Sequence, residues 1–79
     1  MSNHDQQIEE LEAAALRIED LERVAEERFD AAYALAEAAN DPSQALKTPE
    51  FSAWMAARAE TDEAWCRWVT AMDARPSSN

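Results

Sequence analysis

The single histidine is the first residue of this chain that could carry acid–base or metal chemistry, and it has no partner of its kind. His4 lies near the start of the sequence. With one histidine, placed close to the chain start, the sequence shows neither the paired Glu-x-x-His motifs of di-iron bundles nor a zinc-binding spacing. It also shows no Ser–His or Cys–His dyad. We therefore expect His4 to be solvated, and the sequence predicts neither a metal site nor a cofactor.

The single cysteine is the second candidate for chemistry. Cys66 is followed by Arg67, and an adjacent arginine favours a reactive thiol in general, but Asp62 and Glu63 lie one helical turn earlier and oppose that effect. One cysteine forms no internal disulfide, which fits a reducing compartment. The sequence predicts an inert cysteine in a protein that is not an enzyme. Catalysis by Cys66 is kept only as a residual alternative.

Acidic residues are the most prominent feature of the composition. The chain holds 17 Asp and Glu against 7 Lys and Arg, a net charge of −10 at pH 7. Such a field repels nucleic-acid phosphates and anionic membrane surfaces, so we expect neither as a direct partner. Glycine is absent, which leaves no phosphate-cradling loop and no dinucleotide-binding fingerprint.

The acidic excess is concentrated in the first half of the chain, where carboxylates recur at seven-residue intervals. We name this set the acidic ridge; it comprises Glu12, Glu19, Asp20, Glu26, Glu27 and Asp30. We expect the acidic ridge to run along the helix face opposite the apolar stripe. Two interpretations stay open: a solvated face that maintains solubility, or a surface that docks on a basic patch of a partner protein.

Two long helices must position these residues. Residues 5–39 are rich in Ala, Glu, Leu and Arg and contain neither Gly nor Pro, which predicts one helix. Asn40-Asp41-Pro42 ends it, because Asn tolerates a left-handed backbone and Pro cannot continue a helix. Within the connection a single turn is expected to point Leu46 inward.

A second helix is predicted over residues 49–74, with Thr48 as its N-cap and Pro49 at its first position. A short connection makes two such helices antiparallel neighbours. The chain is therefore expected to be all-α, a two-helix hairpin forming a single domain over residues 1–79. The ends, 1–4 and 75–79, are expected to fray as tails.

The apolar residues of both helices follow heptad spacing. In the first helix one seam position holds Leu11, Ile18, Ala25, Ala32 and Ala39, and the other holds Ala14, Leu21, Arg28 and Leu35. The second helix carries a stripe of Phe51, Trp54, Arg58, Thr61, Trp65, Trp68 and Met72. We expect these aromatic residues to form the core, the alternative being that Trp54 or Trp68 anchors a partner.

The arginines in these stripes have two interpretations. Arg28, Arg58 and Asp62 are expected either to form a partly buried salt bridge that fixes the register, or to leave the two arginines as a small anion-binding pair.

The unequal helix lengths predict self-association. With Ala39 placed beside Pro49, about nine residues of the first helix extend beyond the second and leave Ile8 and Leu11 uncovered. A wide apolar stripe on so short a chain needs further cover. We expect a homodimer in which two hairpins form a four-helix bundle, with Ile8, Leu11 and Leu21 mediating self-association.

The sequence shows neither a basic and apolar leader nor an apolar run near the roughly 20 residues that span a bilayer. We therefore expect a cytoplasmic protein. In size and charge alone the chain is similar to small acidic helical proteins, some of them phage-encoded inhibitors, that occupy nucleic-acid-binding surfaces; the likeness includes no motif and transfers no residue.

The leading functional hypothesis is a non-enzymatic protein-interaction module. It would act as an inhibitor or antagonist that binds a basic surface of a partner protein through the acidic ridge, a nucleic-acid-binding surface being one candidate. The alternative is a structural or scaffold subunit that assembles through its Trp-rich second helix.

Overall fold

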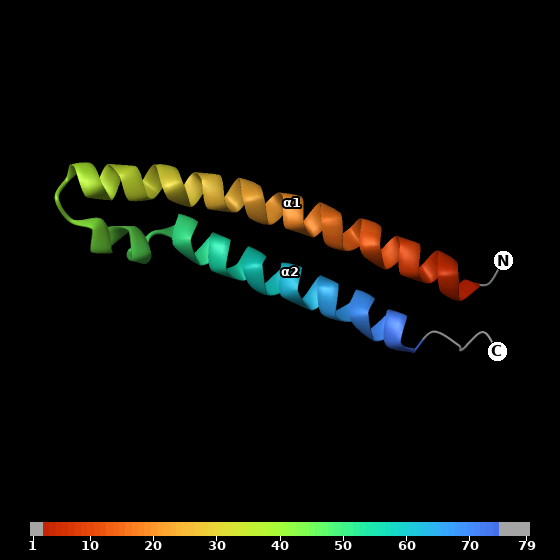
Figure 1. The fold of residues 1–79 in the computed structure, drawn as a ribbon. Helices are drawn as coiled ribbons and strands as arrows, with labels where there is room; N and C mark the ends of the chain where they lie inside the picture. The colour runs from red at the N-terminus through yellow and green to blue at the C-terminus, as the bar shows by residue number, and fades with distance from the viewer. Residues whose placement is uncertain (1–2, 75–79) are drawn as a thin grey trace.

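The computed structural model describes residues 3–74, which form two antiparallel helices joined by a short helical connection (Figure 1). Helix α1 spans Asn3–Ala38, the 3-10 helix η1 spans Pro42–Lys47, and helix α2 spans Pro49–Asp73. No strand occurs between residues 3 and 74. The predicted all-helical hairpin is confirmed. The predicted tail segments 1–2 and 75–79 lie outside the described residues, whereas Asn3 and His4 already belong to α1.

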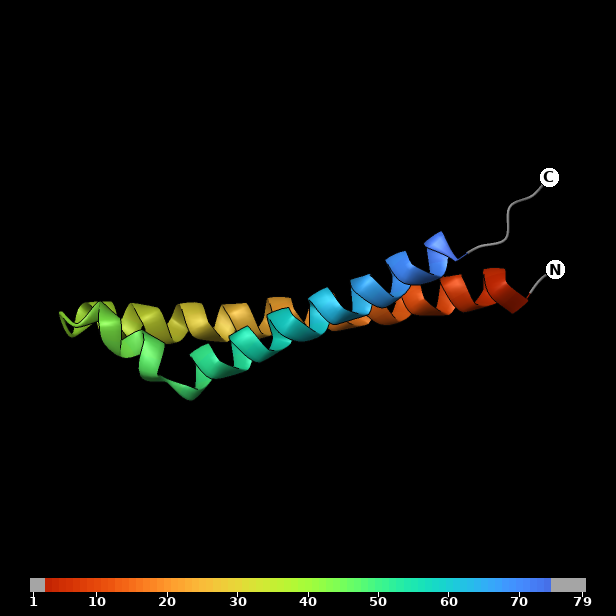
Figure 2. The same cartoon turned by 90° about the horizontal axis from the view of Figure 1, so that it is seen from below.

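The hairpin is a rod only two helices thick, with principal extents of 62 × 15 × 15 Å. Figure 2 shows α2 crossing α1 at a shallow angle along the length of the rod. The buried residues are few: Ala15, Phe29, Ala45, Thr61 and Ala64. Of the helices described, none combines the length and the apolar character needed to cross a membrane.

The connection is built by the residues that the sequence marks as helix ends. Asn40 has a positive φ of 62°, the left-handed conformation expected of it. The side-chain oxygen of Thr48 accepts a hydrogen bond from the backbone N–H of Phe51 at 3.2 Å and so caps α2. The single turn expected here is η1, but its buried residue is Ala45. The prediction for Leu46 was wrong, since this side chain is 57% exposed.

Asp41 organises the first turn of η1. Its carboxylate accepts hydrogen bonds from Ser43 Oγ at 2.7 Å and from Gln44 Nε2 at 3.1 Å. The bond from Ser43, followed by the bond from Gln44, lowers the pKa of Asp41 from its ordinary value. Because the folded-state pKa is the lower one, these bonds stabilise the fold above the unfolded-state pKa. That contribution is lost as the pH falls through the folded-state pKa.

This arrangement makes the Asp41 carboxyl a local probe of the connection. We expect an NMR titration to give Asp41 a pKa below that of a free aspartate. Ser43→Ala should raise this pKa, because it removes the hydrogen bond that lowers the pKa more than the bond from Gln44 does. An Asp41 pKa that stays the same in Ser43→Ala would contradict this account of the turn.

The seam between α1 and α2 is shifted by one row from the predicted seam. The α1 residues that are buried or half-buried at this seam form two rows: Ile8, Ala15, Glu22, Phe29 and Ala36, and Leu11, Ile18, Ala25 and Ala32. The second row is the predicted one except for Ala39, which is exposed and lies beyond the end of α1. The first replaces the predicted row of Ala14, Leu21, Arg28 and Leu35, in which Leu21 is 64% and Leu35 76% exposed.

A similar shift occurs on α2, where Ala57, Ala64 and Ala71 lie against α1 together with Trp54, Thr61 and Trp68. The other half of the predicted stripe, Phe51, Arg58, Trp65 and Met72, flanks this seam. Alanines at the centre allow two helix backbones to approach closely, while large rings fill the space beside them.

The predicted overhang of α1 was wrong. His4 Nε2 donates a hydrogen bond to the carbonyl oxygen of Ala71 at 3.0 Å, so the N-terminal end of α1 lies beside the C-terminal end of α2 (Figure 1). Ile8 and Leu11 are both half-buried. The reason is that η1 packs against the C-terminal part of α1. The start of α2 therefore lies closer to the N-terminal end of α1 than the expectation assumed when it placed Ala39 beside Pro49.

Candidate protein-interaction surface

The acidic ridge lies on the surface of α1, and the side chains of all six of its residues are exposed. At about 1.5 Å per residue the ridge is ~27 Å long from Glu12 to Asp30, close to the diameter of a small domain. Its position differs from the expected one. Glu12, Glu19 and Glu26 each follow a seam residue directly, so the ridge flanks the seam instead of lying opposite the apolar stripe.

Two carboxylates of the ridge are partly neutralised by an arginine on the same helix. Arg23 forms an ion pair with Asp20, and Arg23 Nη1 lies 3.7 Å from Glu27 Oε1. The hydrogen bond and charge of Asp20, followed by the charge of Glu27, raise the pKa of Arg23. These exposed pairs add little stability. Their consequence is that Asp20 and Glu27 offer less free charge to a partner.

Three carboxylates of the ridge remain uncompensated. Within residues 3–74, Glu12, Glu26 and Asp30 form neither an ion pair nor a side-chain hydrogen bond. Glu26 and Asp30 are also like charges one turn apart, which disfavours the isolated helix slightly. These three residues therefore carry most of the charge that the ridge presents to solvent.

One carboxylate of the ridge contacts the second helix. Trp65 Nε1 donates a hydrogen bond to Glu19 Oε2 at 3.3 Å. The Trp65 ring is half-buried and packs edge-on against Trp68, with 5.5 Å between ring centroids and 88° between planes. Sequence reasoning missed this contact, because the two residues are 46 positions apart. It joins the acidic ridge to the flank of the Trp-rich helix.

The aromatic residues are divided between the two ends of the rod. Near η1, Phe29 stacks on Trp54 with 5.0 Å between centroids and meets Phe51 at 5.4 Å. The indole N–H groups of Trp54 and Trp68 are buried and have no hydrogen-bond partner among residues 3–74. Most of the Trp-rich face is therefore used in packing against α1.

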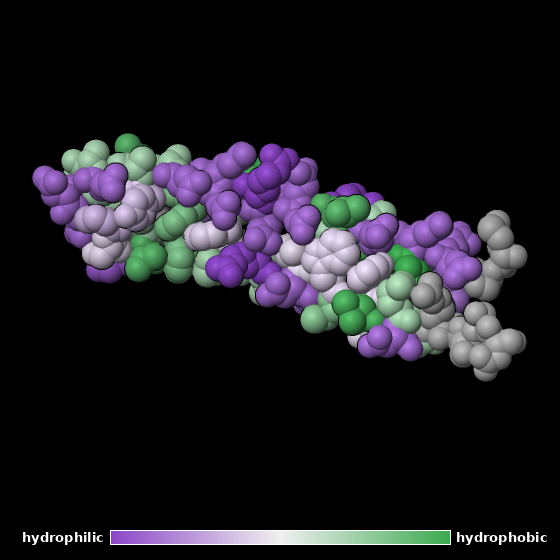
Figure 3. Space-filling model, in the orientation of Figure 1, coloured by the Kyte–Doolittle hydropathy of each residue, from purple (hydrophilic) through white to green (hydrophobic). Residues whose placement is uncertain are grey.

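Figure 3 shows apolar and pale residues gathered toward both ends of the rod, with a hydrophilic band between them.

Some apolar surface remains open near the ridge. Leu16 on α1 is 51% exposed and Val69 on α2 is 48% exposed. Leu16 lines a shallow depression together with Arg17, Glu19, Asp20 and Arg23. A partner surface that combines arginines with apolar side chains would find both of its complements here.

The predicted salt bridge between Arg58 and Asp62 was wrong. The Arg58 guanidinium lies over the Trp54 ring, 5.7 Å from its centroid, a distance at which a cation is attracted to the ring face. Arg58 and Asp62 are both exposed, and no ion pair joins them in the described part of the chain. Arg28 is exposed as well and lines a different groove, with Glu50 and Ala53.

The two residues singled out for chemistry lie at one end of the hairpin. His4 and Cys66 both line an open groove of about 510 Å³ between α1 and α2. His4 is half-buried rather than solvated, because its ring is held on Ala71. No hydrogen bond between His4 and Cys66 is present among the described residues. The same residues contain no group of three or more His, Cys, Asp or Glu that could hold a metal ion.

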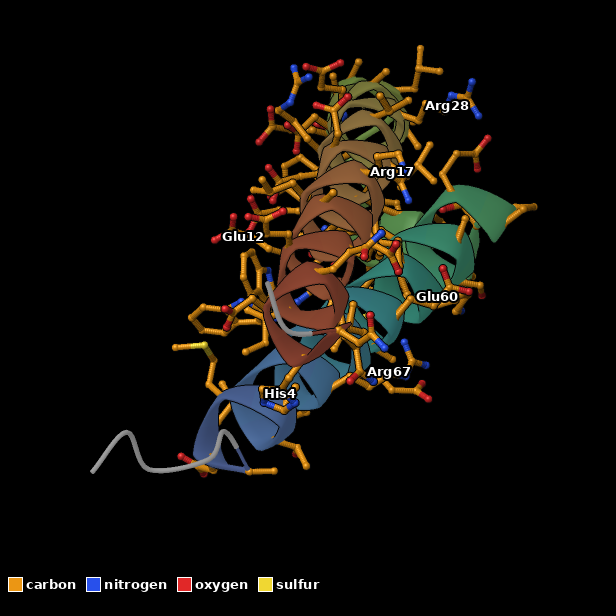
Figure 4. All side chains as sticks on the ribbon, turned by 90° about the vertical axis from the view of Figure 1, so that its right-hand side faces the viewer. His4, Glu12, Arg17, Arg28, Glu60 and Arg67 are labelled. Atoms are coloured by element: carbon orange, nitrogen blue, oxygen red, sulfur yellow. The ribbon has the colours of Figure 1, made fainter. Side chains whose placement is uncertain are left out.

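The surface as a whole offers a partner exposed carboxylates beside the apolar side chains of Leu16 and Val69, on one flank of the rod. Glu12 lies on one side of α1 in Figure 4, whereas Arg17 and Arg28 lie on the other. Charge is therefore divided between two flanks of the same helix. No family model, no curated protein and no solved structure matches this chain.

Proposed function

We propose that this chain is a non-enzymatic interaction module that binds a basic surface of a partner protein through the acidic ridge. The proposal rests on one observation above all: Glu12, Glu26 and Asp30 are exposed and uncompensated along one flank of α1. Complementary charge accelerates association and selects among partners, even where each exposed pair contributes only ~0–1 kcal/mol.

The apolar residues beside the ridge support the same proposal. Arginine and lysine side chains carry a hydrocarbon stem, which packs well on surfaces such as those of Leu16 and Trp65 while the cation reaches a carboxylate. Protein surfaces that bind nucleic acid combine such cations in clusters. Covering one of them would block access of the nucleic acid, so we propose that the module acts as an inhibitor or antagonist in the cytoplasm.

The proposal is tested by capture of partners from the native host on three immobilised baits. These are the wild type, a ridge variant (Glu12→Gln, Glu26→Gln, Asp30→Asn) and a control variant (Glu9→Gln, Glu10→Gln, Glu37→Gln). Both variants remove three exposed carboxylates from α1, so they share one net charge. We expect a basic partner to bind the wild type and the control and to be lost from the ridge variant, and we expect that partner to lose nucleic acid when the wild type binds.

Equal capture by all three baits would contradict the proposal. A partner that binds the ridge variant normally but is lost with Val69→Asp would instead support the scaffold function through the Trp-rich helix, because Val69 is an exposed apolar residue of that helix and not one of the ridge carboxylates.

A further inference from the structure

The flank of the hairpin away from the acidic ridge has no role in the proposed function, yet it carries a second row of apolar residues. Leu21 and Leu35, at 64% and 76% exposed, have the most exposed large apolar side chains among residues 3–74. They lie two heptads apart in the row that also contains Ala14 and Arg28; Ala14 is half-buried, whereas Leu21, Arg28 and Leu35 are exposed. A helix with apolar residues in three neighbouring heptad rows is typical of a bundle with more than two helices.

Grooves open on the same flank. One is the groove of about 510 Å³ at the open end of the hairpin, which Leu11, Ala71 and Ala74 line with apolar atoms. The second, of about 210 Å³, lies near η1 and is lined by Ala25, Arg28, Pro49, Glu50 and Ala53. Small residues line much of both grooves, so the side chains of another helix could approach closely.

The charges on this flank are nearly balanced, unlike those of the chain as a whole. Figure 4 shows Arg17, Arg28, Glu60 and Arg67 on the side away from Glu12. With the groove residues Glu50 and Glu63, and with Glu10 seven residues before Arg17 in the same row of α1, they make three cations and four anions, of which Arg67 and Glu63 are already paired at 2.8 Å. We call this flank the neutral face; its charged residues are Glu10, Arg17, Arg28, Glu50, Glu60, Glu63 and Arg67.

Charge selects what can cover the neutral face. A second copy of a chain with a net charge of −10 would be repelled by the acidic ridge, where like charges would meet. The neutral face presents both signs, so two copies related by a twofold axis can place cations against anions.

The exposed area also suits a second copy. A stable interface of standard size removes roughly 800 Å² from each partner, which is a small share of the 5,921 Å² that this chain exposes. One copy of the hairpin, packed face to face, would provide this cover.

We propose that the neutral face binds a second copy of this chain, forming a twofold-symmetric four-helix bundle in which Leu21 and Leu35 are buried. The two acidic ridges then point outward on opposite sides of the dimer. Of the three residues expected to mediate self-association, Leu21 is exposed on the neutral face and Leu11 lines its larger groove. Leu11 and Ile8 are also both half-buried at the seam of their own hairpin.

The test is sedimentation equilibrium over a wide range of concentration, with circular dichroism to verify helicity. We expect the wild type to sediment with twice the chain mass of 8.9 kDa. Leu21→Asp should raise the dissociation constant on the order of 30-fold or more, because it places a charge in an apolar interface. Leu16→Asp is the matched control: this leucine is also about half exposed, but lies beside the ridge, and its substitution should leave the dimer intact.

The proposal is overturned if the wild type has the mass of one chain at every concentration, or if Leu16→Asp dissociates the dimer and Leu21→Asp does not. Should Leu21→Asp lose helicity, Leu35→Asp provides the same comparison at a more exposed position. Capture of a basic partner depends on other residues, so its failure and the failure of dimerisation are distinguishable.

Discussion

Replacing Phe29 by alanine is expected to destabilise the hairpin by ~3–5 kcal/mol, the usual cost of truncating a buried aromatic residue. Phe29 is 9% exposed and is the only large side chain among the buried residues. Its ring contacts Tyr33, Phe51 and Trp54, with centroid distances of 6.3, 5.4 and 5.0 Å. A chain of this length has a total stability of roughly 4–12 kcal/mol, so the substitution removes a large share of it.

The measurement is chemical unfolding of wild type and variant at equal protein concentration, because association would add to the apparent stability. Trp65→Ala is the informative comparison. Trp65 has a larger ring, but it is half-buried on the flank of the seam, and we expect its truncation to cost less. A Phe29→Ala variant that is as stable as the wild type, or more stable than Trp65→Ala, would show that the core does not centre on Phe29.

The parts of the fold that the sequence predicts well are those set by neighbouring residues. Asn40-Asp41-Pro42 ends one helix and Thr48-Pro49 begins the next, and the structure has both features where they were expected. Capping and proline geometry act over a few residues, so they can be recognised without knowledge of the fold.

The seam could not be assigned from the sequence because alanine makes the heptad frame ambiguous. Ala13, Ala14 and Ala15 are consecutive, so a frame through either Ala14 or Ala15 is equally apolar at that point. The frame through Ala15 turns Phe29 toward the second helix, whereas the frame through Ala14 turns Leu21 and Leu35 toward it. Aromatic stacking of Phe29 on α2 favours the first. The seam is therefore decided by packing between residues far apart in the sequence, which no local sequence pattern can predict.

The overhang and the contact between Glu19 and Trp65 have a common origin. Both depend on how far α2 slides along α1, which is set by the space that η1 occupies against α1. The expectation placed Ala39 directly beside Pro49 and therefore allowed no length along α1 for residues 40–48. The exposure of the acidic ridge was nonetheless predictable, because a helix in a two-layer rod leaves most of its charged rows in solvent.

The largest expected effect on function is on the rate of association. At low salt, the ridge variant (Glu12→Gln, Glu26→Gln, Asp30→Asn) should bind a basic partner about tenfold more slowly than the wild type, because steering by complementary charge is lost. The fold should be unaffected, since the three side chains are exposed, and repulsion between Glu26 and Asp30 is removed as well.

Two ionic strengths separate steering from contact. The screening length falls from about 14 Å at ~50 mM salt to about 4 Å at ~500 mM, so the wild-type rate should fall toward that of the variant while the variant changes little. The control variant (Glu9→Gln, Glu10→Gln, Glu37→Gln) has the same net charge, yet its carboxylates lie beyond the ends of the ridge. If steering came from net charge alone, control and ridge variant would be slowed equally. A larger loss in the ridge variant, present at low salt and absent at high salt, would assign the effect to the positions of Glu12, Glu26 and Asp30 on one flank of α1.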